Sequence, residues 1–349
     1  MQDHVERHSD NHMQSSRNSQ PTGQLTKTTA PVNIQNSKVN EMKSHILNAL
    51  RECGGCLSGE TLSHQLGTSR VSIWKHIRSL KEDGYVIEAS PRGYRLISSP
   101  DSLRPCEFPD LEQRIHYFPQ IGSTMDAARD LAKKGAKDGT IVIAESQTHG
   151  RGRLSREWLS PQGGIYFSLI LRPRMNPAFA PRINLMAAVA VAATIRKLFG
   201  LKAELKWPND VLIQNKKVCG ILAEMDAEMD VVNFVNVGIG INANNSVAQF
   251  EKTATSLKDT LRREIARKEF LTVLLEEIER RLSLLMKTDL IEEWKKLSVT
   301  LGKDVRVMSL GEEVVGRAVD IDATGALIVK GKDGSLRTVL VGDCVHLRG

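Results

Sequence analysis

A segment rich in glycine and arginine, residues 150–164, constrains this chain more than any other stretch. It reads GRGRLSREWLSPQGG and has no apolar repeat typical of a strand or a helix, so it predicts a loop. The apolar runs on either side, 140–144 and 165–171, are typical of strands, which places the loop at the edge of a sheet. Backbone N–H groups at glycines and the forked guanidinium groups of arginines can converge on a small anion. The segment therefore indicates an anion-binding loop, although a basic surface loop or an RNA-contacting segment would have the same composition.

Three further motifs accompany this loop in a fixed order. Gly122-Ser123-Thr124 precedes it, and Lys206-Trp207-Pro208-Asn209-Asp210 and Gly238-Ile239-Gly240-Ile241-Asn242 follow it. A single glycine-rich match is a weak signal, but the four motifs together resemble the biotin protein ligases. The resemblance covers roughly residue 58 to the C-terminus, so it applies to nearly the whole chain.

Composition bounds the class of protein. A chain of 349 residues with 41% hydrophobic residues has room for two or three domains, and its net charge of +7 suits a polyanionic partner. The five scattered cysteines favour a reducing compartment, and Cys53-Gly54-Gly55-Cys56 lacks the second pair that a zinc site needs. No apolar run has the length that spans a bilayer, so we expect a cytoplasmic protein with no membrane partner and no tightly bound metal.

The N-terminal quarter divides into a tail and a compact domain. Residues 1–39 are polar and nearly free of large apolar side chains, which predicts a disordered tail. Residues 40–98 predict a winged helix-turn-helix, with the helix-turn-helix at Ser58–Ile77 and a two-stranded wing at 85–97. We expect Val71, Trp74, Ile77 and Leu80 to form the buried stripe of the second helix. The residues predicted to face DNA are Ser69 (also the N-cap), Arg70, Ser72, Lys75, His76 and, on the wing, Arg92.

The predicted domain resembles the DNA-binding domain of bifunctional biotin protein ligases, which also repress biotin genes. This resemblance implies operator DNA as a partner and a homodimer promoted by biotinyl-5′-AMP. Residues 99–112 are expected to be a linker because of their prolines, 113–298 the catalytic domain, and 299–349 a small domain of short strands. The fold class implied is multidomain α+β, with a central mixed sheet and helices like those of class II synthetases and a C-terminal SH3-like barrel.

The resemblance also implies which residues bind the ligand. The expected biotin or biotinyl-5′-AMP site consists of Ser123, Thr124, Met125, Gln147, Gly150, Arg151, Gly152, Arg153, Arg156, Trp158, Lys206, Gly220 and Asn242. Among these, Arg151, Arg153 and Lys206 are the expected catalytic residues. The family often has asparagine at the position of Met125. Lys217 is a second-rank candidate for a phosphate contact, and Arg317 a weaker one for the nucleotide or the carrier protein.

The implied reaction is a two-step ligation that uses ATP, Mg²⁺ and biotin. The biotin carboxylate attacks the α-phosphorus of ATP, and a lysine of the biotin carboxyl carrier protein then displaces AMP from the resulting anhydride. Cations must stand between a carboxylate and a triphosphate, which suits the arginines and Lys206. Because the anhydride is labile, we expect the 150–164 loop to close over it, with Trp158 helping to exclude water.

Three alternatives remain open from the residues. The chain is a ligase without repressor activity, a ligand-sensing repressor without catalysis, or a lipoate ligase that shares the central fold. The intact arginine loop, Lys206 and Asn242 argue against lost catalysis, and the motif at 206–210 suits biotin better than lipoate.

Overall fold

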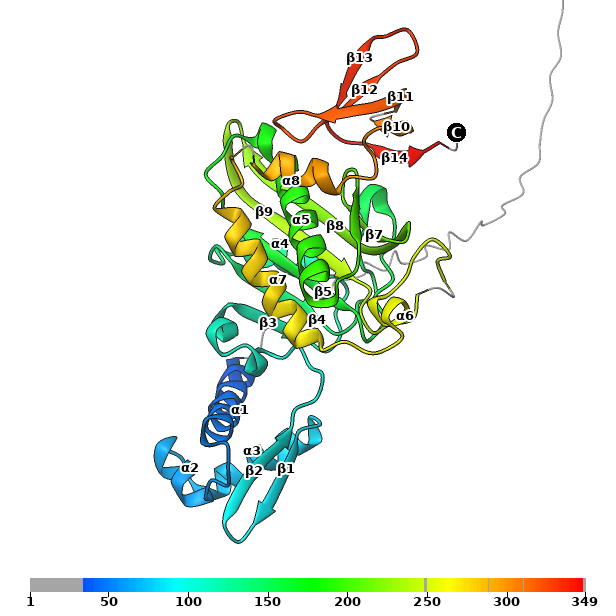
Figure 1. Ribbon diagram of the computed structural model, residues 1–349. Coiled ribbons are helices and arrows are strands. Elements are labelled where there is room, and N and C mark those ends of the chain that lie inside the picture. The colour runs from blue at the N-terminus through cyan, green and yellow to red at the C-terminus, as the bar shows by residue number, and fades with distance from the viewer. Residues whose placement is uncertain (1–33, 248–249, 288, 310, 348–349) are drawn as a thin grey trace, which may run out of the picture.

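The computed structural model describes residues 34–247, 250–287, 289–309 and 311–347, with side chains described from residue 41 onward. Figure 1 shows three parts in a row: N-terminal helices with a two-stranded ribbon, a central sheet covered by helices, and a small C-terminal sheet. Residues 1–33 of the predicted tail lie outside the described residues. Helix α1 (Ile34–Cys53) begins before the predicted end of that tail.

The N-terminal part has the order of elements predicted for a winged helix. After α1 come α2 (Gly59–Gln65), α3 (Arg70–Glu82), β1 (Val86–Ser90) and β2 (Gly93–Ser98), with the two strands antiparallel. Ser58 and Ser69 are the N-caps of α2 and α3, and each hydroxyl accepts a hydrogen bond from a backbone N–H of the first turn. The common core is formed by Ile46, Leu47, Leu50, Leu62, Ile73, Ile77 and Leu80.

The predicted buried stripe of α3 is wrong at two positions. Ile77 and Leu80 are buried, but Val71 is 63% exposed and Trp74 is 52% exposed, and Ile73 takes their place in the core. Positions 71, 74, 77 and 80 repeat every three residues, so they drift by about 60° around the helix at each step. The spacing of Ile73, Ile77 and Leu80 keeps to one face, which explains why these three are the buried ones.

The predicted linker is packed between the two larger domains. It contains two short 3₁₀ helices, Pro105–Glu107 and Pro109–Arg114. The carboxylate of Glu107, with no exposed side-chain surface, pairs with Arg51 of α1 at 2.6 Å and with Lys268 of the central domain at 2.7 Å. Burial alone would raise the pKa of Glu107, but these cations and the Tyr85 hydroxyl hold it below its usual value. These contacts join the winged helix to the central domain.

The central domain is built on a seven-stranded sheet with the order β3-β4-β5-β9-β8-β7-β6. Strands β3 and β4 are parallel, and every other pair is antiparallel. The strands are β3 (Ile115–Phe118), β4 (Thr140–Ala144), β5 (Ile165–Leu171), β6 (Ala203–Lys206), β7 (Asp210–Ile213), β8 (Lys216–Glu228) and β9 (Val231–Ile241). The long central strands β5, β9 and β8 carry the floor of the cavity described below.

Helices cover both faces of this sheet (Figure 1). Helix α4 (Thr124–Lys133) packs through Ala128 and Ala132 on one face. The other face is covered by α5 (Pro181–Phe199), α7 (Arg267–Leu282) and α8 (Asp289–Leu297). The stretch Pro177–Phe199 is long and apolar enough to cross a membrane, but 67% of its apolar window is buried inside the protein. Its burial is that of a core helix, as its all-round apolarity predicts.

The chain from 257 to 282 forms two helices with a break between them. Helix α6 (Leu257–Leu261) ends at Arg262, which has a left-handed backbone with φ 57°, and α7 starts only at Arg267. Ile265 is buried in the connection between them. Neither glycine nor proline lies in 258–266, so no residue type that ends helices marked the break.

The C-terminal part is a five-stranded antiparallel sheet with the order β13-β12-β11-β10-β14. Its strands are β10 (Asp304–Ser309), β11 (Glu312–Ile321), β12 (Leu327–Lys330), β13 (Leu336–Val339) and β14 (Asp343–His346). Trp207 of the central domain donates its backbone N–H to Thr300 and its indole N–H to the carbonyl of Gly325. The C-terminal sheet is therefore tied to the corner that follows Lys206.

Candidate active site

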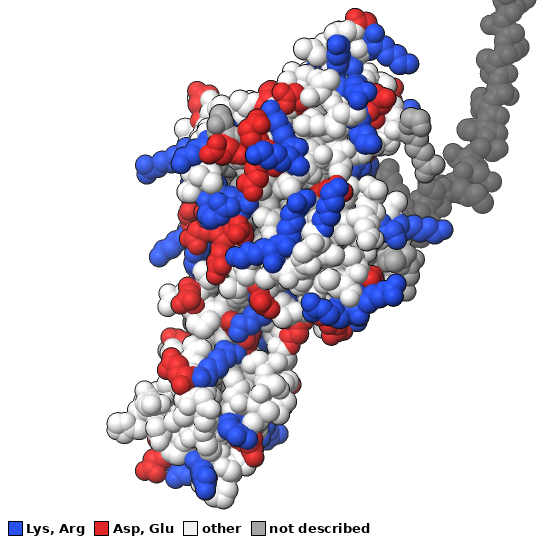
Figure 2. All heavy atoms as spheres, in the orientation of Figure 1, with Lys and Arg blue, Asp and Glu red and all other residues white. Residues whose placement is uncertain are grey.

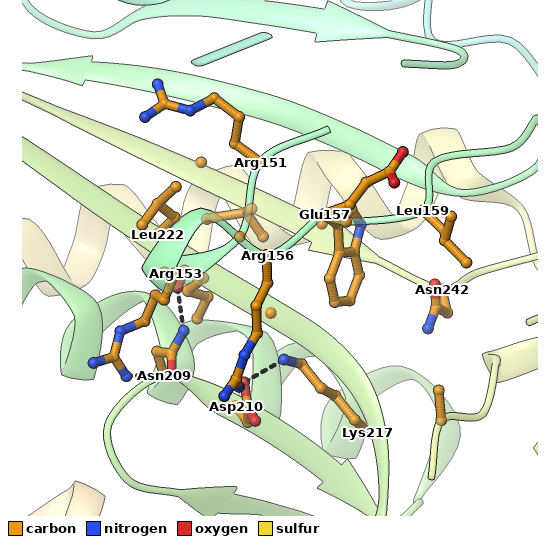
Figure 3. Close-up of a pocket in the computed structure, with 18 of the residues that line it drawn as sticks. Arg151, Arg153, Arg156, Glu157, Leu159, Asn209, Asp210, Lys217, Leu222 and Asn242 are labelled. Carbon is orange, nitrogen blue, oxygen red and sulfur yellow. Dashed lines mark hydrogen bonds and ion pairs between the residues drawn. The ribbon is translucent and has the colours of Figure 1, made fainter. Parts of the chain in front are cut away.

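Most of the predicted ligand residues line one cavity, which has a volume of about 370 Å³ and lies above strands β8 and β9. Of the thirteen, all line it except Ser123 and Gly150, each of which is next in sequence to a lining residue. The members in the wall are Thr124, Met125, Gln147, Arg151, Gly152, Arg153, Arg156, Trp158, Lys206, Gly220 and Asn242. Figure 3 shows that the labelled side chains come from the 150–164 loop on one side and from β7, β8 and the end of β9 on the other. Motifs far apart in sequence thus meet in one place.

One end of the cavity is a chain of uncharged hydrogen-bonding groups. Gln147 accepts from the backbone N–H of Thr124 at 2.8 Å and donates to the hydroxyl of Ser160 at 2.8 Å. The Thr124 hydroxyl donates to Gln147 at 3.0 Å and accepts from Ser168. Ser123 is 2% exposed, and its hydroxyl has no hydrogen-bond partner within the described part of the chain. A buried hydroxyl without a partner is costly, which marks this end as a place for a polar ligand group.

The floor of the cavity is bare backbone at paired glycines. Gly220 of β8 and Gly240 of β9 are register partners, and the indole of Trp158 rests on both. A Cβ atom at Gly240 would lie 2.3 Å from the indole nitrogen, and one at Gly220 would lie 2.9 Å from the indole ring. Trp158 therefore occupies the space directly above Gly240. The indole nitrogen is buried and has no hydrogen-bond partner among the described residues.

Gly240→Ala is expected to displace Trp158 and weaken ligand binding by at least tenfold. The added methyl group cannot coexist with the indole at the distance given above, so the loop residue must move. Isothermal titration with biotinyl-5′-AMP, the expected ligand that extends over this floor, measures the effect. The matched control is Gly55→Ala, where the added Cβ would meet no atom nearer than 3.7 Å; both variants are compared at equal folded fraction. Equal affinity for biotinyl-5′-AMP in Gly240→Ala and wild-type protein would contradict this packing.

Arg151 is turned away from the other loop arginines. Its guanidinium donates to Glu224 at 2.5 and 3.2 Å and to Asp126 at 3.1 Å. Figure 3 shows its side chain pointing to the side opposite Arg153 and Arg156. The charge of Arg151 is therefore already compensated by two carboxylates in this arrangement of the loop.

Arg153 and Arg156 connect the loop to the neighbouring domain. Arg153 donates to the Asn209 amide oxygen at 3.2 Å and to the carbonyl of Gly342 at 2.7 Å, so its partners are uncharged. Arg156 pairs with Asp343 at 2.5 Å, and this pairing raises the pKa of Arg156 and lowers that of Asp343. The C-terminal sheet thus supplies two of the groups that hold the basic loop.

Lys206 differs from the other cations of the cavity because it makes no ion pair with any described residue. It ends β6 immediately before the buried Trp207, which the C-terminal sheet anchors. Lys217, in contrast, pairs with Asp210 at 2.7 Å and lies 5.2 Å from the centre of the Trp158 ring. Among the described residues of the cavity wall, Lys206 and Arg153 are therefore the two cations that make no direct ion pair with a carboxylate.

Sequence reasoning did not assign several residues of the cavity wall. The main ones are Glu157, Leu159, Phe167, Asn209, Asp210, Leu222, Val247, Glu251, Thr253, Ala254 and Asp343. Asn209 and Asp210 belong to the quoted motif after Lys206, so their position was available as a signal. Asp343 lies more than 180 residues from its partner Arg156, and nothing in the local sequence indicates that pairing. Arg317, a weak candidate, is not in the wall.

The residues predicted to face DNA differ in exposure. Ser69, Arg70, Lys75 and Arg92 are exposed, whereas Ser72 and His76 are half-buried. Burial, together with the nearby Lys43, lowers the pKa of His76. All five cysteines are free thiols, and the described residues contain no group of three His, Cys, Asp or Glu side chains that could hold a metal ion.

Comparison with known proteins gives the same division into three parts. The description "Biotin/lipoate A/B protein ligase family" matches residues 117–242, "Biotin protein ligase C terminal domain" matches 300–347, and "HTH domain" matches 43–95. The bifunctional ligase/repressor BirA of Bacillus subtilis (strain 168) is 38% identical over 293 residues, which cover 80% of this chain and 90% of that protein. This chain belongs to the family of bifunctional biotin ligase/repressors. The BirA protein of Escherichia coli (strain K12) is 30% identical over 311 residues, covering 85% of this chain and 95% of its own length.

A solved structure shares the fold of the ligase part of this family. The biotin protein ligase from Aquifex aeolicus in complex with biotin and ATP has a TM-score of 0.58 and 29% identity, and covers 67% of this chain and 99% of that chain. The match agrees with a central sheet whose cavity is built from the four motifs.

Proposed function

We propose that this protein is an ATP-dependent biotin protein ligase that also represses transcription. It forms biotinyl-5′-AMP and transfers biotin to a lysine of the biotin carboxyl carrier protein of acetyl-CoA carboxylase. The observation that carries this proposal is the single cavity in which the basic loop, Lys206 and Asn242 meet. The family membership and the helix-turn-helix support the second activity. Its place of action is the cytoplasm.

The two ends of the cavity suit the two ends of biotinyl-5′-AMP. The uncharged chain of Ser123, Thr124 and Gln147 offers donors and acceptors to the ring end of biotin, and the unpartnered Ser123 hydroxyl would gain a partner there. The bare backbone of Gly220 and Gly240 and the side-chain amide of Asn242 suit the adenylate. Trp158, now on the glycine floor, would move aside or stack on that ligand.

The cations of the cavity account for the chemistry. A carboxylate approaching a triphosphate meets like charge, and Lys206 and Arg153 stand in the wall without a carboxylate to neutralise them. They are positioned to stabilise the negative charge that develops on the phosphoryl oxygens. Arg156 and Lys217 are held by Asp343 and Asp210, so their first role is to position the loop and the strand edge. Arg151 can stabilise charge on the ligand only if its guanidinium leaves Glu224 and binds the ligand instead.

Mg²⁺ is expected to enter with ATP. The carboxylates nearest the cationic end of the cavity, Asp210 and Asp343, already pair with Lys217 and Arg156. Oxygen ligands suit Mg²⁺, and a dedicated protein cage is not needed for it. We therefore infer that phosphate oxygens would hold the ion, and that it would take part of the phosphate charge.

The basic loop is proposed to rearrange over the ligand. Leu154 and Ser155 have left-handed backbones, with φ of 53° and 58°, and Leu154 is 67% exposed. Such strain at non-glycine residues marks segments whose conformation changes in function. Trypsin cleavage at Arg151, Arg153 and Arg156 should be several-fold slower with biotin and ATP than without ligand, while cleavage at the exposed Arg263 stays constant. Equal rates at the loop with and without ligand would contradict this rearrangement.

The repressor activity is proposed to depend on a homodimer that biotinyl-5′-AMP promotes. Two winged helices related by a two-fold axis then match a two-fold operator. The buried Glu107 pairs, which fix the winged helix to the central domain, supply the rigid connection that such a dimer needs. We also propose the domain limits 40–98, 113–298 and 299–349, and a closed SH3-like barrel for the C-terminal sheet.

Pyrophosphate release tests the first step and separates biotin from lipoate as the substrate. The protein with Mg-ATP should release pyrophosphate on addition of biotin and not on addition of lipoate. Release with lipoate alone would favour a lipoate ligase. No release with either acid, despite biotin binding, would favour a ligand-sensing repressor that has lost catalysis.

A further inference from the structure

Helix α3 exposes an apolar stripe on the side opposite to its core. Val71 is 63% exposed and Trp74 is 52% exposed, whereas Ile73, Ile77 and Leu80 on the other side are at most 3% exposed. The guanidinium of Arg78 lies 5.9 Å from the centre of the Trp74 ring. Val71, Trp74 and Arg78 are spaced by three and four residues, so they form one row along the outer face of the helix.

Val71 and Trp74 of this row line a hollow between the helix and the wing. The hollow has a volume of about 700 Å³, and its wall consists of Ser58, Gly59, Glu60, Arg70, Val71, Trp74, Ala89, Ser90, Pro91, Gly93 and Tyr94. The surface of the N-terminal domain at the lower end of Figure 2 is largely uncharged, with both basic and acidic side chains scattered over it. Val71 and Trp74 are thus two neighbouring apolar groups in a concave surface, not isolated side chains.

The charges around the hollow favour nucleic acid as its occupant. Arg70 lines the hollow, and Lys75 and Arg92, which are next in sequence to lining residues, are exposed like Arg70. None of these three makes an ion pair within the described part of the chain, so they are available to phosphates. The acids nearby are fewer: Glu82 pairs with Arg78 and Glu88 pairs with Arg95, which leaves Glu60 at the edge.

The position of Val71 and Trp74 determines what they would touch. In a helix-turn-helix, the N-terminal residues of the second helix contact base edges in the major groove. Val71 is the second residue of α3 and Trp74 the fifth. The apolar group that the major groove presents is the 5-methyl group of thymine, because the other base-edge groups there are hydrogen-bond donors and acceptors.

We propose that Val71 and Trp74 read thymine methyl groups in the operator, while Arg70, Lys75 and Arg92 bind the adjacent phosphates. This inference rests on the repressor function proposed above. Sequence periodicity assigned Val71 and Trp74 to the core. In this proposal the same two residues determine DNA specificity.

The test removes only the methyl groups. A duplex is first selected from a random library by the full-length protein with biotin and Mg-ATP, and each thymine is then replaced in turn by deoxyuridine. Fluorescence anisotropy at one fixed salt concentration should show about a fourfold loss of affinity at one or two thymines in each half-site, the amount expected for one buried methyl group. Trp74→Ala and Val71→Ala should bind the thymine duplex more weakly and should no longer distinguish thymine from uracil at those positions.

The matched control is Val86→Ala, which removes an exposed apolar side chain of the wing that does not line the hollow. It should keep the full thymine-to-uracil ratio, and all three variants should keep wild-type ligase activity, which shows that they are folded. Uracil that binds as tightly as thymine at every position, or variants that keep the wild-type ratio, would overturn the reading by Val71 and Trp74 while leaving the repressor intact. Failure to select any duplex would instead overturn the repressor function and this proposal with it.

Discussion

Lys206→Ala is expected to slow biotinyl-5′-AMP formation by about 10²–10³-fold, the usual cost of removing one preorganised group that stabilises developing charge. Lys206 makes no ion pair with a described residue, so its charge is available to the ligand. Its position is fixed because the next residue, Trp207, is 1% exposed and hydrogen-bonded twice to the C-terminal part. The loss should fall mainly on kcat, since the charge it stabilises is largest in the transition state. Single-turnover formation of the adenylate from radiolabelled ATP measures it.

Lys216→Ala is the matched control, because Lys216 starts β8, is exposed and does not line the cavity. It should retain wild-type rates. Arg153→Ala should resemble Lys206→Ala, since Arg153 also has only uncharged partners. If the rate of adenylate formation fell tenfold or less in both Lys206→Ala and Arg153→Ala, this expectation would be contradicted. The ion-paired cations Arg151, Arg156 and Lys217 would then provide most of the charge stabilisation.

Arg267→Ala is expected to lower the free energy of unfolding by about 3–5 kcal/mol, as for other buried charge networks that lose one partner. Arg267 is 4% exposed and its guanidinium bonds to Asp101, Glu145 and the carbonyl of Gly164. Without it, the carboxylate of Glu145, a residue that is 9% exposed, keeps only the Tyr117 hydroxyl and the backbone N–H of Leu103 as partners. Urea unfolding followed by the fluorescence of the buried Trp207 and Trp294 reports on the central domain.

The same substitution should also weaken biotin binding, because Gly164 ends the basic loop. Arg263→Ala is the control: Arg263 is exposed and makes no ion pair among the described residues, so its removal should change stability by less than about 0.5 kcal/mol. A change in Arg267→Ala no larger than in this control would show that the buried network contributes little to the fold.

Local patterns were enough for part of the sheet and for part of the site. The apolar runs 140–144 and 165–171 are strands β4 and β5, as predicted, and the four motifs supplied Lys206, Asn242 and the loop arginines. The prediction placed Val71 and Trp74 in the core, which is wrong. Residues three apart lie on nearly the same face over one helical turn, but a repeat of three moves around the helix and reaches another face after three turns. The end of α6 at Arg262 could not be predicted from sequence, because neither glycine nor proline marks it.

Other features of the site depend on tertiary structure. The pairing of Arg151 with Glu224 and of Arg156 with Asp343 joins residues separated by 73 and 187 positions. Which arginines face the ligand and which are neutralised follows from these pairs, and no motif contains that information. The packing of Trp158 on Gly220 and Gly240 similarly depends on the register that pairs β8 with β9. Motifs identified the candidate side chains, and the fold separates them into free and compensated charges.

The intact mass of an acceptor protein tests the central claim most directly. Purified protein is incubated with biotin, Mg-ATP and a biotin carboxyl carrier domain, and the carrier is weighed by mass spectrometry, with Lys206→Ala and Arg151→Ala run alongside. The account predicts a gain of one biotinyl group on the carrier with wild-type protein and a much slower gain with Lys206→Ala. A carrier whose mass stays unchanged with wild-type protein, under conditions where biotin is bound, would contradict it.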